Sequence, residues 1–164
     1  MSAKPLVSII MGSANDWEVM QQSARALQDF GVTYDARVIS AHRSPDLLSD
    51  YIKEVSAQGV QCFIAGAGGA AHLAGVIAGK TTLPVLGVPI PSKYLKGMDS
   101  LLSIVQMPKG IPVATFAIGE AGAANAGLFA VAMLALNDAA LATKLTAYRQ
   151  KQADAIKATT LPAL

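Results

Sequence analysis

Two kinds of apolar spacing alternate along the chain, and together they predict strands that alternate with helices. Short apolar stretches predict strands, and apolar residues three and four positions apart predict helices. The predicted strands cover residues 6–11, 32–39, 60–65, 83–88 and 112–118. The predicted helices cover about 15–30, 44–58, 71–79, 99–106, 120–136 and 138–157.

This alternation predicts an α/β fold of three layers (αβα), in which helices cover both faces of a parallel sheet. Five strands in 164 residues favour the flavodoxin-like order 2-1-3-4-5. In that order the loops after the first three strands meet at the switch point of the sheet, where such folds bind ligands. We expect one domain over residues 1–164, with a core at about 6–137, a C-terminal helix at about 138–157 and a loose tail from 159.

The composition indicates a protein that buries part of its surface against copies of itself. Apolar residues make up 52% of the chain and charged residues 15%, whereas about a quarter of a soluble domain is charged. This deficit of charge predicts a homo-oligomer. The net charge of +2 comes without a basic cluster, so no nucleic-acid partner is expected. The apolar stretch 121–136 contains Asn125 and many small residues, which favours a buried helix over a membrane span, so no membrane partner is expected.

The corner Ser40–Pro45 places a histidine beside an arginine, between a predicted strand and a predicted helix. Ser44 is expected to cap that helix and Pro45 to occupy its first turn. His42 can take up or release a proton near neutral pH, and Arg43 can bind a phosphate through two parallel hydrogen bonds. A solvated Arg–His pair without a function is the alternative for this corner taken alone.

Two further loops follow the first and third predicted strands. After the first strand, Ser13 offers a hydroxyl, Asp16 offers a carboxylate for a sugar diol, and free backbone N–H groups at the helix start would attract an anion. Alternatively, Asp16 only caps the helix. After the third strand, the small residues 66–71 would let a planar ligand approach the backbone closely, and His72 follows them. A packed or water-bonded histidine is the alternative for His72.

The loop 66–71 also matches the dinucleotide pattern G-x-G-x-x-A, but we reject that assignment. It follows the third strand rather than the first, and no acidic residue about 20 positions further on could bind a ribose. The chain contains no G-x-x-x-x-G-K-[ST] loop, and its two histidines, 30 positions apart, make a weak metal site. We therefore expect no metal and no cofactor, but a pocket for a phosphorylated sugar derivative.

The cysteine and two of the aromatic residues are expected to have packing roles. Cys62 lies inside an apolar stretch, where a thiol is a poor nucleophile. A single cysteine forms no internal disulfide, which is consistent with a cytoplasmic protein. Tyr94 and Trp17 are predicted to pack rather than to stack on a ligand.

Five blocks of the sequence resemble the PurE family of purine biosynthesis, the N5-carboxyaminoimidazole ribonucleotide mutases. The resemblance extends over roughly residues 7–138. The blocks that carry it are 11–17, 40–45, 64–73, 99–108, and 117–119 with 122–125. It implies a cofactor-free homo-octamer that moves a carboxylate from the exocyclic nitrogen of an aminoimidazole ribotide to ring carbon C4.

The resemblance also implies roles for single residues. His42 matches the proton carrier of the family. The residues that match its substrate contacts and pocket-lining positions are Ser13, Asp16, Arg43, Ser40, Gly68 and His72. Asn15 departs from the pattern because many relatives carry serine there, which leaves a contact between this residue and the phosphate open.

Two other activities are alternatives to the mutase. The first is direct carboxylation of aminoimidazole ribotide by CO2, although Arg43 and the complete set of blocks resemble the mutase class more. The second is a non-catalytic module that binds a flavin or a nucleotide, because the fold is shared with such proteins.

Overall fold

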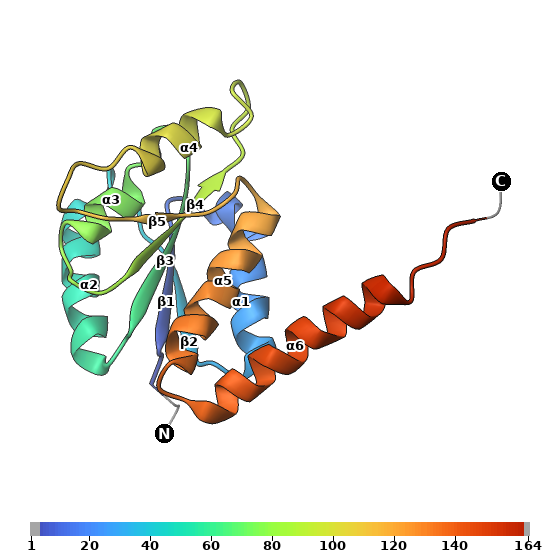
Figure 1. Cartoon of the computed structure of the whole chain (residues 1–164). Coiled ribbons are helices and arrows are strands. Elements are labelled where there is room, and N and C mark those ends of the chain that lie inside the picture. The colour runs from blue at the N-terminus through green and yellow to red at the C-terminus, as the bar shows by residue number, and fades with distance from the viewer. Residues whose placement is uncertain (1–3, 163–164) are drawn as a thin grey trace.

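The computed structural model describes residues 4–162, and a parallel sheet of five strands in the order β2-β1-β3-β4-β5 forms its centre (Figure 1). The strands are β1 (Val7–Met11), β2 (Tyr34–Val38), β3 (Cys62–Gly68), β4 (Val85–Ile90) and β5 (Ala114–Thr115). The predicted fold class and strand order are confirmed. The switch point therefore lies between β1 and β3.

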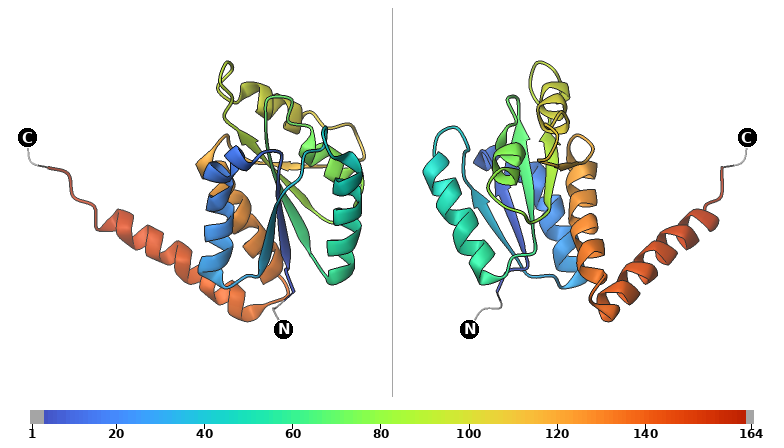
Figure 2. Two further views of the ribbon diagram at one scale, coloured as in Figure 1. Left: turned by 180° about the vertical axis from the view of Figure 1, so that it is seen from behind. Right: turned by 60° about the vertical axis from the view of Figure 1, so that its left-hand side comes forward.

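Helices cover both faces of the sheet and complete the three predicted layers (Figures 1 and 2). One face carries α1 (Trp17–Phe30) and α5 (Glu120–Ala135). The opposite face carries α2 (Pro45–Gln58), α3 (Leu73–Ala78) and α4 (Met98–Val105). A single 3-10 turn, η1 (Ala14–Asp16), leads from the loop after β1 into α1.

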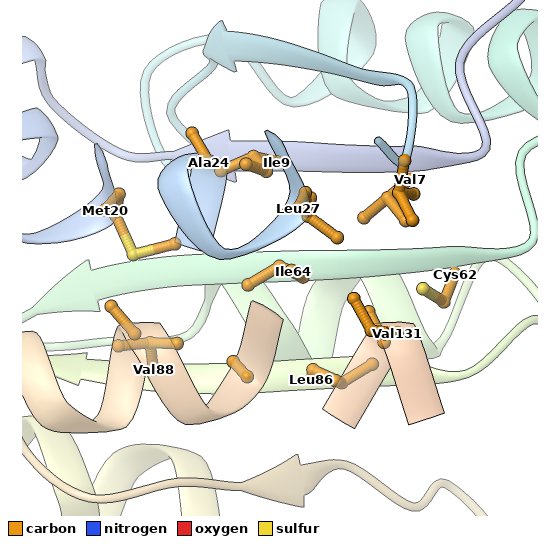
Figure 3. Close-up of a cluster of buried hydrophobic side chains, with 14 of the residues drawn as sticks. Val7, Ile9, Met20, Ala24, Leu27, Cys62, Ile64, Leu86, Val88 and Val131 are labelled. Atoms are coloured by element: carbon orange, nitrogen blue, oxygen red, sulfur yellow. The ribbon is translucent and has the colours of Figure 1, made fainter. Parts of the chain in front are cut away.

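The alternation of side chains along the central strands divides the core into two clusters. On β1, Val7 and Ile9 face α1 and α5, whereas Ile10 faces α2. Figure 3 shows the first cluster, in which Leu27 of α1 and Ile64 of β3 are among the residues that pack together. Burial of one large aliphatic side chain contributes about 1.5–3 kcal/mol. The two clusters thus fix the strand ends from which the loops begin.

β3 and β4 run further than the sequence predicts. The predictions end them at residues 65 and 88, but Ala67 pairs with Pro89, and the ladder continues to Ile90. Small residues in β3 give no apolar signal, and a proline usually ends a central strand. Pro89 is tolerated because its backbone faces the β5 side beyond the end of β5, where its carbonyl accepts a hydrogen bond from the Gly119 N–H at 2.9 Å.

β5 is much shorter than the predicted strand 112–118. Only Ala114 and Thr115 pair with β4, although the Phe116 N–H still donates to the Gly87 carbonyl at 2.9 Å. The apolar character that suggested a longer strand has a different cause, since Phe116 packs against the core under α5.

The C-terminal helix α6 (Ala139–Lys157) begins at the predicted position, where the Asp138 side chain accepts the Leu141 N–H at 3.0 Å. Leu141 is its one buried residue, and the helix extends away from the sheet (Figures 1 and 2). Residues 159–162 are exposed. The predicted domain and tail also include residues 1–3 and 163–164, which lie outside the described part. Within residues 4–162, no helix combines the length and the apolar character that a membrane crossing requires.

Candidate active site

The loops after β1, β2 and β3 meet at the carboxyl end of the sheet and line a cavity of about 320 Å³. Small-molecule sites usually have about 300–1,000 Å³. The lining residues are Gly12, Ser13, Ser40, Ala41, His42, Arg43, Ala67, Gly68, Ala70 and Leu73. Five of the predicted site residues are in this set. The other two, Asp16 and His72, are hydrogen-bonded to lining residues.

Three larger cavities lie elsewhere. The one of about 380 Å³, between β2 and α2, contains carboxylates but no histidine, and its Asp35 already accepts hydrogen bonds from Arg37 and Tyr51. The other two offer less chemistry. One of about 530 Å³ lies at the amino end of β4 and β5, and no titratable side chain lines it. The other, of about 520 Å³, lies between α5 and α6 and is lined mainly by apolar residues, together with Tyr148 and Arg149. The smaller cavity at the carboxyl end is therefore the better candidate for catalysis.

His42 and His72 come from different loops and contact each other. Nε2 of His42 lies 3.0 Å from Nδ1 of His72, and the ring planes are nearly perpendicular, at 86°. Both residues are exposed, so His72 is not packed in the core. A ligand can therefore reach an exposed pair of imidazoles, of which His42 lines the cavity and His72 lies behind it in contact with His42.

Arg43 connects the second loop to the first. Its Nη2 donates to the Gly12 carbonyl at 2.8 Å, and its Nε donates to the Ser40 hydroxyl at 3.3 Å. A guanidinium has five N–H groups. These two contacts use only some of those N–H groups, so the others remain available to bind an anion.

Ser44 occupies the predicted cap position, and Pro45 begins α2, but the expected side-chain cap is wrong. The Ser44 hydroxyl donates to the Ser40 carbonyl at 3.0 Å, and the Ser44 N–H donates to the same oxygen at 2.9 Å. Because the hydroxyl turns back toward Ser40, it closes the 40–44 corner instead of accepting a helix N–H.

The first loop uses most of its own N–H groups. The Asp16 carboxylate accepts the Ser13 N–H at 3.0 Å, and the Ser13 hydroxyl accepts the Asn15 N–H at 3.3 Å, which together form a capping box. The Gly12 and Asp16 N–H groups donate to the carbonyls of Gly66 and Ser13. The prediction of free N–H groups for an anion is therefore wrong at these four positions. Arg43 and the Ser13 side chain are left as the candidates for anion binding.

Asp16 is half-buried beneath the first loop. Burial raises the pKa of its carboxyl, and this shift is opposed by backbone hydrogen bonds from Ser13 and Gly12 and by the charge of Arg43. The capping role weighed for Asp16 is confirmed. A contact between Asp16 and a sugar stays a prediction.

The glycines of the third loop have different roles. A Cβ on Gly66 would collide with the Met20 side chain, so Gly66 allows α1 to pack on β3. Gly68 is exposed at the cavity, and Gly69 has a φ of 68°, which favours glycine. The predicted close approach of a ligand is therefore possible at residues 68–70 but not at Gly66.

Comparison with known proteins shows to which family the chain belongs. The model of the AIR carboxylase family matches residues 6–155. The chain belongs to the AIR carboxylase family. It is 55% identical over 157 residues to the N5-carboxyaminoimidazole ribonucleotide mutase of Vibrio parahaemolyticus, which covers 96% of this chain and 98% of that protein. It is 57% identical over 150 residues to the protein of the same name from Brucella melitensis, which covers 92% and 93%.

Solved structures agree with the family assignment. The crystal structure of PurE from Treponema denticola matches with a TM-score of 0.85 and 31% sequence identity, and the match covers 93% of this chain and 94% of that chain. The predicted resemblance to the PurE family is thereby confirmed.

Two serines of α4 hold the third loop of this AIR carboxylase family member, and sequence reasoning missed both. The Ser100 hydroxyl accepts the Gly69 N–H at 2.9 Å and donates to the Ile90 carbonyl at 2.7 Å. The Ser103 hydroxyl also lies 3.3 Å from the Gly69 carbonyl, but its shorter contact, at 2.7 Å, is to the Asp99 carbonyl of its own helix. Ser100 is fully buried. A signal was present, because Ser100 stands four positions before Ile104 on the buried face of α4, where a polar residue needs partners.

The predictions for three residues outside the cavity have different outcomes. Cys62 is a core residue, as predicted, and burial raises the pKa of its thiol to about 12, so it carries no thiolate near neutral pH. The prediction for Tyr94 is wrong, because this residue is 84% exposed in the loop before α4. Trp17 is 40% exposed and packs only in part.

The described residues of this family member offer little to a metal ion. Within residues 4–162, no group of three or more His, Cys, Asp and Glu side chains is placed to hold one. His42 and His72 contact each other instead.

Proposed function

We propose that the chain is an N5-carboxyaminoimidazole ribonucleotide mutase of de novo purine biosynthesis, and therefore an isomerase. The observation that carries the proposal is that His42, Arg43 and Ser13 line one cavity at the switch point of the sheet. Relatives of 55% and 57% identity that bear this name support it. The product would be 4-carboxy-5-aminoimidazole ribonucleotide.

The reaction needs one proton carrier and a closed space. The bond between the exocyclic nitrogen and the carboxyl carbon breaks, CO2 leaves, and the nitrogen gains a proton. CO2 then forms a bond to C4, and C4 loses its proton. His42 would give the first proton and take the second, so it ends in its original state; acid–base catalysis of this kind contributes about 10²–10⁴-fold. CO2 that stays in the cavity recombines without a diffusive encounter.

The other predicted residues would bind and orient the ribotide. Arg43 would bind the phosphate through the part of its guanidinium that the protein does not use. Ser13 and Asp16 would contact phosphate and sugar, respectively. Ser40, Gly68 and His72 would complete the walls around the base, where the exposed backbone at Gly68 lets a planar ring approach.

Direct carboxylation of the ribotide is the second candidate, because the matching family is described as AIR carboxylase. The two are distinguished by supplying each substrate separately at low bicarbonate. We expect turnover of the N-carboxylated ribotide alone. Robust carboxylation of the unmodified ribotide, with no turnover of the N-carboxylated one, would overturn the mutase assignment.

The assembly, domain organisation and location are also part of the proposal. We propose a single domain that forms a homo-octamer in the cytoplasm, without a resident cofactor or metal and without a nucleic-acid or membrane partner. Exposed apolar side chains on α4, α5 and α6, such as Leu102, Phe129 and Ile156, support self-association. Light scattering of the full chain would test the octamer, and a monomer at micromolar concentration would contradict it.

A further inference from the structure

The contact between His42 and His72 limits where hydrogens can lie on the two rings. The distance of 3.0 Å between Nε2 of His42 and Nδ1 of His72 is a hydrogen-bond distance. A neutral imidazole carries one hydrogen on one of its two nitrogens. A neutral pair therefore carries two hydrogens, one in the shared bond and one on an outer nitrogen. The outer nitrogens are Nδ1 of His42 and Nε2 of His72.

Two arrangements satisfy this limit. In the first, His42 donates from Nε2, its Nδ1 keeps a free lone pair, and His72 carries its hydrogen on Nε2. In the second, His72 donates from Nδ1, and His42 carries its hydrogen on Nδ1. The Nε2–H form is the more stable form of an isolated histidine side chain, and the first arrangement gives this form to both rings. The first arrangement is therefore favoured, and it leaves His42 with a basic nitrogen.

We propose that His72 is a positioning residue, which accepts the Nε2–H of His42 and so presents Nδ1 of His42 as the nitrogen that exchanges protons with a ligand. The hydrogen bond is the same whether Nδ1 of His42 is protonated or not. His42 can thus give a proton and take one back without turning its ring. The effect on turnover rests on the proposed function, but the arrangement of the pair does not.

The backbone holds His72 where this role requires it. His72 directly precedes α3; its N–H donates to the Ala70 carbonyl at 2.8 Å, and its carbonyl accepts the Val76 N–H at 2.9 Å. Leu73 and Ile77 anchor the same helix in the core. The acceptor nitrogen of His72 is therefore set by a packed element, whereas His42 lies in a turn.

The arrangement can be measured by nitrogen-15 NMR on the full chain labelled at histidine, without a ligand. The chain has only two histidines, so the His42→Asn variant assigns both sets of signals. In the unaltered protein we expect His42 as a single Nε2–H tautomer. In His72→Leu, which removes the acceptor, we expect a mixture of tautomers. His72→Asn is the matched control, because its amide oxygen lies close to the position of Nδ1 and should restore the single tautomer.

The same variants test the consequence for catalysis. We expect His72→Leu to lower kcat about 10–100-fold, as is common when a partner that orients a functional histidine is lost, with KM changed less than about threefold. His72→Asn should recover most of kcat.

Three outcomes would overturn the assignment: an Nδ1–H tautomer of His42 in the unaltered protein, an unchanged tautomer in His72→Leu, or an equal loss of kcat in the Asn and Leu variants. The third result would mean that His72 carries a proton itself. If the unaltered protein turns over neither ribotide, the proposed function fails, and the NMR result still decides the arrangement of the pair.

Discussion

The cavity at the carboxyl end of the sheet and the 520 Å³ cavity between α5 and α6, here called the groove, differ in how completely a single chain forms them. In the cavity, polar groups from distant segments already contact one another: His42 contacts His72, and Arg43 contacts Gly12. In the groove, Phe116 and Phe129 pack edge to face, but Phe129 is still 47% exposed. The geometry of the cavity is thus determined within the chain, whereas the groove leaves apolar surface in contact with water.

This difference has a structural cause. Every cavity group lies within a few residues of the end of β1, β2 or β3, so the ladder that joins these three strands fixes its position. The groove depends on α6, which contributes only Leu141 to the core. We therefore expect substitutions in the cavity to change chemistry without changing assembly, and substitutions in the groove to do the opposite.

The largest effect is expected for His42→Asn. Loss of the proton carrier should lower kcat by about 10²–10⁴-fold, while the thermal unfolding temperature stays close to that of the unaltered protein because His42 is exposed. Steady-state kinetics and calorimetry measure the two quantities. Activity within tenfold of the unaltered protein would remove His42 from its proposed role.

Arg43→Ala should act mainly on binding. A hydrogen bond to a charged group contributes about 1.5–3 kcal/mol, so we expect KM to rise about 10–100-fold. Arg43→Lys is the graded control, since lysine keeps the charge but not the planar fork. An unchanged KM in the alanine variant would argue against a phosphate contact.

Ser100→Ala should loosen the third loop. The variant leaves the Gly69 N–H and the Ile90 carbonyl without their buried partner, which should lower the free energy of unfolding by about 1–3 kcal/mol. Ser103→Ala is the matched control and should cost less, because Ser103 is only part-buried. Equal losses in chemical denaturation would mean that Ser100 has no special role.

Asp16→Asn should show a small effect on stability that depends on pH. Because burial raises the pKa of Asp16 in the folded state, this carboxyl favours folding where it is protonated. That contribution is complete below about pH 4 and is lost as the pH rises through the raised value. The stability of the variant relative to the unaltered protein should therefore increase from acid to neutral pH. Denaturant titrations at several pH values would reveal a constant or decreasing difference if this is wrong.

Phe129→Ser should leave the cavity chemistry nearly unchanged per folded chain but weaken self-association. The ring lines the groove, so its loss removes apolar area from the proposed interface. Light scattering over a range of concentrations measures the effect, with the exposed α6 residue Gln150→Ala as control. An assembly as stable as that of the unaltered protein would show that the groove is not part of the interface.

Most of the fold and much of the cavity could be predicted from the sequence, because both depend on local patterns. Apolar stretches mark the strands, and parallel order brings their carboxyl ends together, which places Ser13, His42 and Gly68 at one cavity. Two of the wrong predictions have different causes. The N–H groups of the first loop are used by its own capping box and turn and by the Gly66 carbonyl of β3, whereas Pro89 continues a strand because the neighbouring strand ends early.

For some features, no local pattern identifies the contact partner. Ser100 is hydrogen-bonded to Gly69, which lies 31 positions away in the sequence, and the two histidines that contact each other are 30 positions apart. Their contacts depend on how α4 and α3 lie against the sheet. Tyr94 illustrates the opposite case, since its aromatic character suggested packing and its place in a surface loop leaves it exposed.

A crystal structure of the full chain soaked with 4-carboxy-5-aminoimidazole ribonucleotide is the decisive test of the proposed catalytic site. We expect the ribotide in the cavity at the carboxyl end of the sheet, with its phosphate at Arg43 and its imidazole ring within hydrogen-bond reach of His42. A ribotide bound elsewhere, or bound with C4 remote from His42, would contradict it.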